Sequence, residues 1–356
     1  MPPLARLPLL LLGALALVTG VGVGLLRFDW PMPAPLVPAA GLHGALMVCG
    51  FFGTVISLER AVALERLWAY AAPLAAGLGT LAALGGPGDP GVAALLYAAA
   101  GAVLLAASVV VVRKQPALFT FTLALGAAAW PAGTLLWAAG WSFEVVVPWW
   151  LAFLVLTIAG ERLELSRFVP KPPVAQRRFR GLLVVMGLGL AGSAWPLGRM
   201  LFGTALLVLA WWLLQYDLAR RTVKTKGLTR YIAVCLLAGY AWLALAGAIV
   251  LVAGGLQPGT PAWDAALHAV ALGFVFSMVF GHAPIVLPSV MRVNLPYHPA
   301  FYGPLAALHG ALALRMAGDA TGHAGLLRWS ALLSALALAA FVAGTLAAVR
   351  RGRRAR

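Results

Sequence analysis

Residues 263–288 read WDAALHAVALGFVFSMVFGHAPIVLP, a mostly apolar run that contains two histidines, His268 and His282. A helix needs about 20 predominantly apolar residues to cross the hydrocarbon core of a bilayer. This segment is long enough, and a Pro-rich connector follows it. The run therefore predicts a membrane-spanning helix.

The composition of the whole chain agrees with that interpretation. Of 356 residues, 62% are hydrophobic and only 10% are charged, and the mean hydropathy is +0.94. Ordinary soluble domains have roughly 45–50% apolar and about 25% charged residues. The composition therefore excludes a water-soluble domain, and it excludes a disordered chain as well.

Similar apolar runs, separated by charged, Gly-rich or Pro-rich connectors, continue along the chain. The run at 181–196 is the shortest. We predict an all-α polytopic transmembrane helix bundle that forms a single integral membrane domain over residues 1–356. Its twelve predicted spans lie near residues 7–26, 39–58, 68–85, 91–112, 117–139, 145–160, 181–196, 200–217, 231–254, 263–288, 300–317 and 325–348.

The basic residues test this segmentation, because short cytoplasmic loops accumulate Lys and Arg. The chain has 26 Lys and Arg against 10 Asp and Glu. Twelve spans with both termini cytoplasmic place all of the basic residues on the cytoplasmic face except Arg27, Arg199, Arg315 and Arg328. The basic connectors near 161–180 and 218–230 and the basic tail at 349–356 then become orientation signals.

This distribution makes membrane lipids the expected partner and gives no indication of nucleic-acid binding. The expected location is the cell inner membrane, as a multi-pass protein. Cys49 and Cys235 lie in separate apolar runs without a Cys-x-x-Cys partner, so neither a disulfide framework nor a thiolate zinc site is indicated.

Histidines are the main ionisable residues inside the predicted spans, where each such residue is a functional candidate. Four of the six lie there: His43 in the second span, His268 and His282 in the tenth, and His309 in the eleventh. From the rise of about 1.5 Å per residue, His43 and His268 lie about 6 and 7 Å inside the outer boundary. His282 and His309 lie about 8 and 13 Å from the inner boundary, which gives an outer and an inner pair.

Imidazole is a common ligand of haem iron and of copper, so these four histidines are candidate cofactor-binding and metal-binding residues. The pentapeptide Leu-His-Gly-Ala-Leu occurs at 42–46 and at 308–312. It places a glycine beside His43 and His309, where a flat macrocycle could approach closely. Met47 and Cys49 follow His43 by one to two turns and are expected to be packing residues, with Met47, on the same face as His43, as an alternative soft ligand. The alternative for every histidine is an interhelical hydrogen bond in the bundle core.

Two motifs carry a resemblance to known families: HGALMVCGFFG from His43, and HAVALGFVFSMVFGH from His268 to His282. Together with the twelve predicted spans, they resemble the haem-copper oxidase catalytic subunit and the twelve-span NnrS family. In the oxidases, the second and tenth helices supply the axial histidine pair of the low-spin haem. The resemblance therefore implies that His43 and His268 would form such a pair.

The chain departs from the oxidases at the histidines that hold their copper and high-spin haem. These come from the sixth and seventh helices, whereas this chain has no histidine between 44 and 267. An oxygen-reducing or NO-reducing centre is therefore not expected. NnrS proteins, which contain haem and copper and are linked to nitric oxide metabolism, are the nearer match, although their paired early histidines are not reproduced around His43.

The resulting hypothesis is a protein that binds b-type haem, with copper as a second candidate cofactor. It would act in electron transfer or in nitrogen-oxide metabolism, together with a redox partner. Two alternatives stay open. One is a secondary transporter or permease without haem, which predicts two six-span bundles and helices interrupted by Gly or Pro. The other is a structural or assembly subunit whose histidines only pack.

Overall fold

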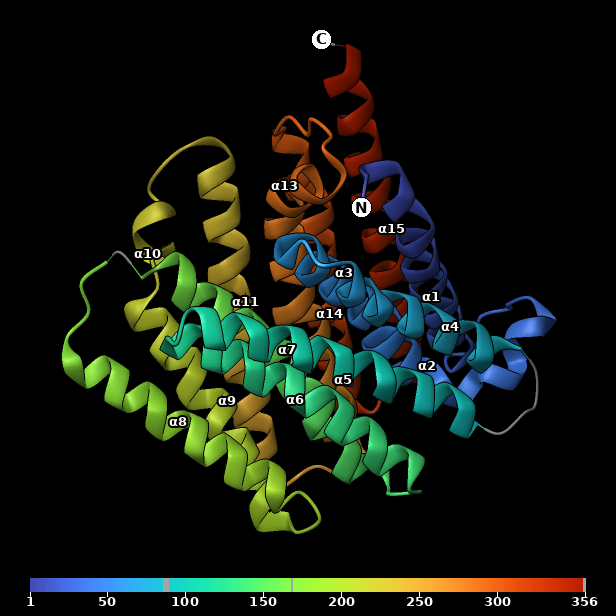
Figure 1. Cartoon of the computed structure of the whole chain (residues 1–356). Helices are drawn as coiled ribbons and strands as arrows, with labels where there is room; N and C mark the ends of the chain where they lie inside the picture. The colour runs from blue at the N-terminus through green and yellow to red at the C-terminus, as the bar shows by residue number, and fades with distance from the viewer. Residues whose placement is uncertain (86–89, 168, 355–356) are drawn as a thin grey trace. The chain divides into compact units, whose positions relative to one another are not determined.

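The computed structural model describes residues 1–85, 90–167 and 169–354 (Figure 1). These residues form helices and connecting turns, with no strand among them. The chain divides into two compact units, Met1–Glu164 and Leu165–Arg356.

The first unit holds six long helical segments. Its second segment is a continuous stretch from Ala34 to Leu64 that contains α2, a π-helical part and α3. Their bounds are α1 Leu7–Leu26, α2 His43–Ala45, α3 Gly53–Leu64, α4 Ala71–Leu84, α5 Pro90–Lys114, α6 Leu118–Ala138 and α7 Phe143–Leu165.

The second unit also holds six long segments and one short helix, α10. One of them, the stretch from Pro261 to Met291, contains α12, a π-helical part and α13. We call this stretch and the stretch Ala34–Leu64 of the first unit the interrupted helices, because a π-helical part interrupts the α-helix in each. The bounds are α8 Pro173–Ala191, α9 Pro196–Tyr216, α10 Ala219–Thr222, α11 Gly227–Val252, α12 Pro261–His268, α13 Ser277–Met291, α14 Tyr302–Thr321 and α15 Ala324–Arg354.

The prediction of an all-α chain is confirmed over the described residues, where ten helices are long and apolar enough to cross a membrane. The long segments follow the twelve predicted runs in order. Two of them, α8 and α14, are not among the ten. The first turns of α8 carry Arg177, Arg178 and Arg180. Whether α8 and α14 cross, and whether both termini are cytoplasmic, stays a prediction.

In the first unit, a glycine stripe on α1 lets the interrupted helix approach closely. A Cβ added at Gly13 would lie 3.4 Å from Thr54, and one added at Gly20 would lie 2.8 Å from the sulfur of Met47. One added at Gly24 would lie 2.9 Å from the ring of His43. Small residues at helix interfaces allow this approach in membrane proteins. The stripe therefore fixes where His43 and Met47 lie.

In the second unit, glycines serve the same purpose where α9 and α11 meet. A Cβ at Gly203 would lie 2.6 Å from Val250, and one at Gly247 would lie 2.7 Å from the Gly203 carbonyl oxygen. Aromatic side chains fill other contacts, such as Phe280 on α13 stacked against Phe341 on α15. In Figure 1, α8 and α9 run side by side and are joined by a tight turn.

Both interrupted helices change to π-helical geometry just after a candidate histidine. The first π stretch, Leu46–Phe52, begins three residues after His43, and the second, Ala269–Phe276, begins directly after His268. Such stretches are rare and are found frequently at functional sites. The second stretch also separates His268 from His282, so the regular α-helical period does not relate the directions of their side chains.

Candidate functional site

His43 lies on the interrupted helix of the first unit and is half-buried. Its Nδ1 is 2.8 Å from the carbonyl oxygen of Gly20 on α1. Because a carbonyl oxygen only accepts, Nδ1 is the nitrogen that donates a proton in this bond. The lone pair of the neutral ring is then on Nε2, the nitrogen through which many histidines bind metals.

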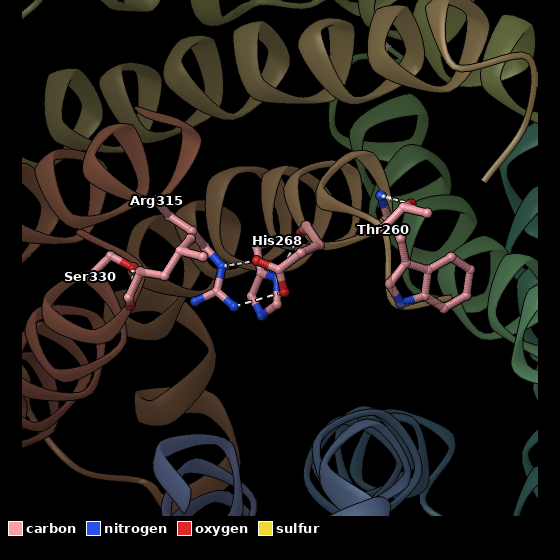
Figure 2. A network of polar contacts seen from close by, with 7 residues as sticks. Thr260, His268, Arg315 and Ser330 are labelled. Carbon is pink, nitrogen blue, oxygen red and sulfur yellow. Dashed lines mark hydrogen bonds and ion pairs between the residues drawn. The ribbon is translucent and has the colours of Figure 1, made fainter. Parts of the chain in front are cut away.

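His268 has the same arrangement in the second unit (Figure 2). Its Nδ1 is 2.8 Å from the backbone carbonyl oxygen of Asp264, one turn earlier on α12. The same nitrogen is 3.3 Å from the carboxylate oxygen Oδ1 of Asp264. Two acceptors on one side of the ring again place the proton on Nδ1 and the lone pair on Nε2.

Arg315 on α14 holds the carboxylate of Asp264 from the other side (Figure 2). Arg315 Nε is 2.6 Å from Asp264 Oδ2, and Arg315 Nη2 is 2.8 Å from Oδ1. This is a bidentate charge-assisted pair, and Arg315 is only 3% exposed. The start of α12 is fixed as well, because the Thr260 hydroxyl accepts a hydrogen bond from the Trp263 backbone N–H at 3.2 Å.

Sequence reasoning treated Arg315 only as an exception to the charge distribution and did not consider Asp264. The available signal was the occurrence of opposite charges near the same boundary of two successive predicted spans. A carboxylate and a guanidinium inside a membrane protein usually pair with each other. That pattern would have predicted the contact, although not its extension to His268.

His309 on α14 forms two interhelical hydrogen bonds through its ring. The indole Nε1 of Trp242 on α11 donates to His309 Nδ1 at 2.9 Å. With Nδ1 accepting, the proton of the neutral ring is on Nε2, which lies 3.2 Å from the Ser277 hydroxyl oxygen on α13. His309 therefore links three helices, which is the alternative role considered for each histidine.

His282 is half-buried on α13. Residues 1–85, 90–167 and 169–354 contain no group of three or more His, Cys, Asp and Glu side chains that could hold a metal ion. The pairing of His282 with His309 and the pairing of His43 with His268 both stay predictions. His43 belongs to the first unit, whereas the other three histidines belong to the second.

Met47 and Cys49 have packing contacts in the first unit. The sulfur of Met47 lies against Gly20 of α1, on the stripe that also receives His43. Cys49 is fully buried, and its Sγ is 3.8 Å from the Thr134 hydroxyl oxygen on α6. These contacts agree with the packing role that the sequence suggests for both residues.

The fold and these buried polar contacts define the class: over the part of the chain that the structure describes, the protein is helical, has ten helices long and apolar enough to cross a membrane, and places polar side chains between helices. The chain belongs to a family described as a domain of unknown function, DUF8744, whose model matches residues 6–350. No curated protein and no solved structure matches the chain. The resemblance to the NnrS and haem-copper oxidase families therefore stays a prediction.

Proposed function

We propose that this protein binds b-type haem in a membrane, with His43 and His268 each as a candidate axial ligand. The observation that carries the proposal is that the two imidazole rings have the same tautomer and the same kind of hydrogen-bond partner. Each donates its Nδ1–H to a backbone carbonyl at 2.8 Å, and each is followed within three residues by the start of a π-helical stretch. A hydrogen bond of this kind fixes the tautomer and the orientation of ligating histidines.

The donor set fits haem better than a copper ion held by side chains alone. Haem iron needs only one or two axial ligands from the protein. A copper site would need a further ligand beside the histidines, and the described residues contain no group of three His, Cys, Asp or Glu side chains that could hold a metal ion. Near His43, a Cβ added at Gly44 would meet only Trp150, at 3.8 Å. A methyl group added at Gly44 would therefore meet no clash.

When bound, haem would supply one-electron chemistry, and the chain would hold, orient and bury it. Electron transfer or nitrogen-oxide metabolism in the inner membrane, with a redox partner, is the role that the NnrS resemblance suggests. An oxygen-reducing or NO-reducing centre is not proposed, because the histidines of such a centre are missing from the corresponding helices.

The test is an optical spectrum with iron and copper analysis of the protein purified in detergent. We expect a haem absorbance that His43→Ala and His268→Ala each reduce strongly. His298→Ala and His323→Ala are matched controls, since both residues are exposed, and they should leave the spectrum unchanged. A wild-type preparation that is colourless and free of iron and copper would overturn the proposal.

A secondary transporter is a second candidate, favoured by the division into two units with six long helical segments each. Two long helices are also interrupted, and α13 contains Pro284 and Pro288. Transporters commonly build their sites from discontinuous helices at the interface of repeats. Uptake of labelled solutes by proteoliposomes of a haem-free preparation would support this candidate. Liposomes without the protein are the control and should take up no solute.

A further inference from the structure

Burying the charged side chains of Asp264 and Arg315 in a membrane protein has a high cost in free energy. Charged side chains within membrane segments are rare and mark functional sites by default. A buried ion pair is also weak evidence for stability, because apolar residues often replace one without loss. Here the carboxylate has a second contact, 3.3 Å from Nδ1 of His268. The pair therefore connects to a ring that the proposed function uses.

We propose that Asp264, held by Arg315, is a positioning residue that sets how strongly the His268 imidazole donates electrons to bound haem iron. This inference rests on the proposed function. A carboxylate close to the Nδ1–H of a ligating imidazole helps to orient the ring and raises its basicity. The bidentate contact with Arg315 fixes the carboxylate and offsets part of its charge.

The geometry separates the charge of Asp264 from its role in holding the ring. The backbone carbonyl of residue 264 accepts from His268 Nδ1 at 2.8 Å, and a side-chain substitution leaves that carbonyl in place. Asp264→Asn therefore keeps the tautomer and removes the negative charge. Arg315→Gln does the opposite, since it removes the positive charge and leaves the carboxylate beside the ring.

The experiment is redox titration of the haem in four variants. Ferric haem is more positive than ferrous haem, so loss of a nearby negative charge raises the reduction potential and loss of a positive charge lowers it. We expect a higher potential in Asp264→Asn, a lower one in Arg315→Gln, and a value near wild type in the double variant. Ser330→Ala is the control, since the Ser330 hydroxyl donates to the Leu327 backbone carbonyl in its own helix at 2.7 Å.

A merely structural pair would give a different pattern, in which both single variants lose haem or shift the potential in the same direction. Either result would overturn the inference while leaving the proposed function intact. If Arg315→Gln does not fold, the inference is still tested by the reduction potential, which should rise in Asp264→Asn and return to the wild-type value in the double variant. A haem-free wild type would instead overturn the proposed function itself.

A readout without haem is also available. With ¹⁵N-labelled histidine, the signals of His268 are identified by their loss in His268→Ala. The haem-free protein should show the tautomer protonated at Nδ1. That signal should shift in Asp264→Asn, and an unchanged signal would exclude the contact with the carboxylate.

A second, independent feature is a basic surface at one end of the second unit, which we name the connector patch. The first turns of α8 lie beside the end of α9 there. Trp212 Nε1 donates to the Ala175 carbonyl at 2.9 Å, and Arg178 donates to the Tyr216 hydroxyl at 3.2 Å. The patch consists of the exposed residues Arg177, Arg178, Arg180, Arg220, Arg221, Lys224, Lys226 and Arg230.

We infer that the connector patch binds the headgroups of anionic phospholipids in the membrane that the helices cross. Over residues 1–85, 90–167 and 169–354, none of its eight cations forms an ion pair with an acidic side chain. Trp211, which is 45% exposed, lies under the guanidinium of Arg178, 5.4 Å from it. Exposed tryptophans typically lie at the headgroup level, and basic clusters beside membrane helices attract anionic lipid.

The test compares retention of phosphatidylglycerol and phosphatidylcholine by the purified protein, measured by native mass spectrometry. Changing Arg177, Arg178, Arg180, Arg220 and Arg221 to Gln should abolish the preference for phosphatidylglycerol, whereas the matched Arg→Lys variant should keep it. Neutralising the tail arginines at 350, 351, 353 and 354 should have a smaller effect. An unchanged preference in the Gln variant, or equally tight binding of a DNA duplex, would overturn the inference.

Discussion

Three of the candidate histidines fall into two groups according to whether Nδ1 donates or accepts a hydrogen bond. In His43 and His268, Nδ1 donates to a carbonyl, which leaves the lone pair on Nε2. In His309, Nδ1 accepts from an indole, and Nε2 is directed to a hydroxyl. The first arrangement suits a ligand, and the second suits a cross-link between helices.

Replacing the partner of His309 should weaken the fold without changing cofactor content. Trp242→Phe removes the indole N–H that donates to His309 Nδ1. Interhelical hydrogen bonds of this kind contribute about 0.6–2 kcal/mol in membrane proteins. We therefore expect a lower thermal midpoint in detergent and an unchanged ratio of haem to protein. Loss of haem in Trp242→Phe would show that His309 serves as a ligand after all.

A methyl group at Gly24 should disturb His43 directly. The added Cβ would lie 2.9 Å from both Cε1 and Nδ1 of the ring, closer than such contacts allow. The ring has to move away from the Gly20 carbonyl, so Gly24→Ala should lower haem content severalfold. The control is Gly310→Ala, where a Cβ has no neighbour within 4 Å. Equal haem content in the two variants would contradict this role of α1.

Sequence reasoning could place histidines inside spans, because a charged or polar residue in an apolar run is visible without a structure. It could not assign their hydrogen-bond partners. The partner of His43 is a backbone carbonyl on another helix, and carbonyls carry no sequence signal. The partners of His309 lie on two further helices, and their register depends on side-chain packing.

Between helices, the sequence predicted the order of the long segments better than their internal geometry. The π stretches Leu46–Phe52 and Ala269–Phe276 consist of ordinary apolar residues, so hydropathy does not distinguish them from an α-helix. For α8, the prediction began at 181, whereas the helix begins at Pro173. Its first turns are basic on the exposed side, while Phe179 and Leu182 pack inward.

Each interrupted helix has a glycine that a tryptophan of a neighbouring helix covers. A Cβ at Gly53 would lie 2.4 Å from the ring of Trp130, and one at Gly273 would lie 2.4 Å from Cγ of Trp242. Overpacking of this kind costs about 1–3 kcal/mol. Gly53→Ala and Gly273→Ala should therefore lower the thermal midpoint. The decrease should be larger for Gly273→Ala, because its Cβ would clash with the base of the Trp242 side chain, which cannot move as easily as the far end of a ring.

The control for these two variants is Gly187→Ala on α8, where a Cβ has no neighbour within 4 Å. There, replacing glycine by alanine in a helix should stabilise the protein by about 0.5–1 kcal/mol. If all three variants behaved alike, the close contacts at the interrupted helices would not be the cause.

For the chain as a whole, the prediction of twelve spans depends on α8 and α14, which are not among the ten described helices that are long and apolar enough to cross a membrane. Both lie in the second unit, and both carry charged residues: Arg177, Arg178 and Arg180 in α8, and Arg315 and Asp319 in α14. Arg315 on α14 is nevertheless buried against Asp264 of α12, a helix in one of the ten spanning stretches. A polar residue that pairs inside the protein does not prevent a helix from lying at membrane depth.

Cysteine labelling distinguishes the possible topologies, because the native Cys49 and Cys235 are both fully buried and should not react. Thr225→Cys and His323→Cys introduce exposed thiols in the α10–α11 connector and in the turn between α14 and α15. If α14 crosses, twelve spans place residue 225 on the cytoplasmic face and residue 323 on the opposite one. A membrane-impermeant maleimide added to intact cells should then label His323→Cys only. Protection of both sites in intact cells, with labelling after lysis, would instead place α14 on the cytoplasmic side and exclude the twelve-span topology.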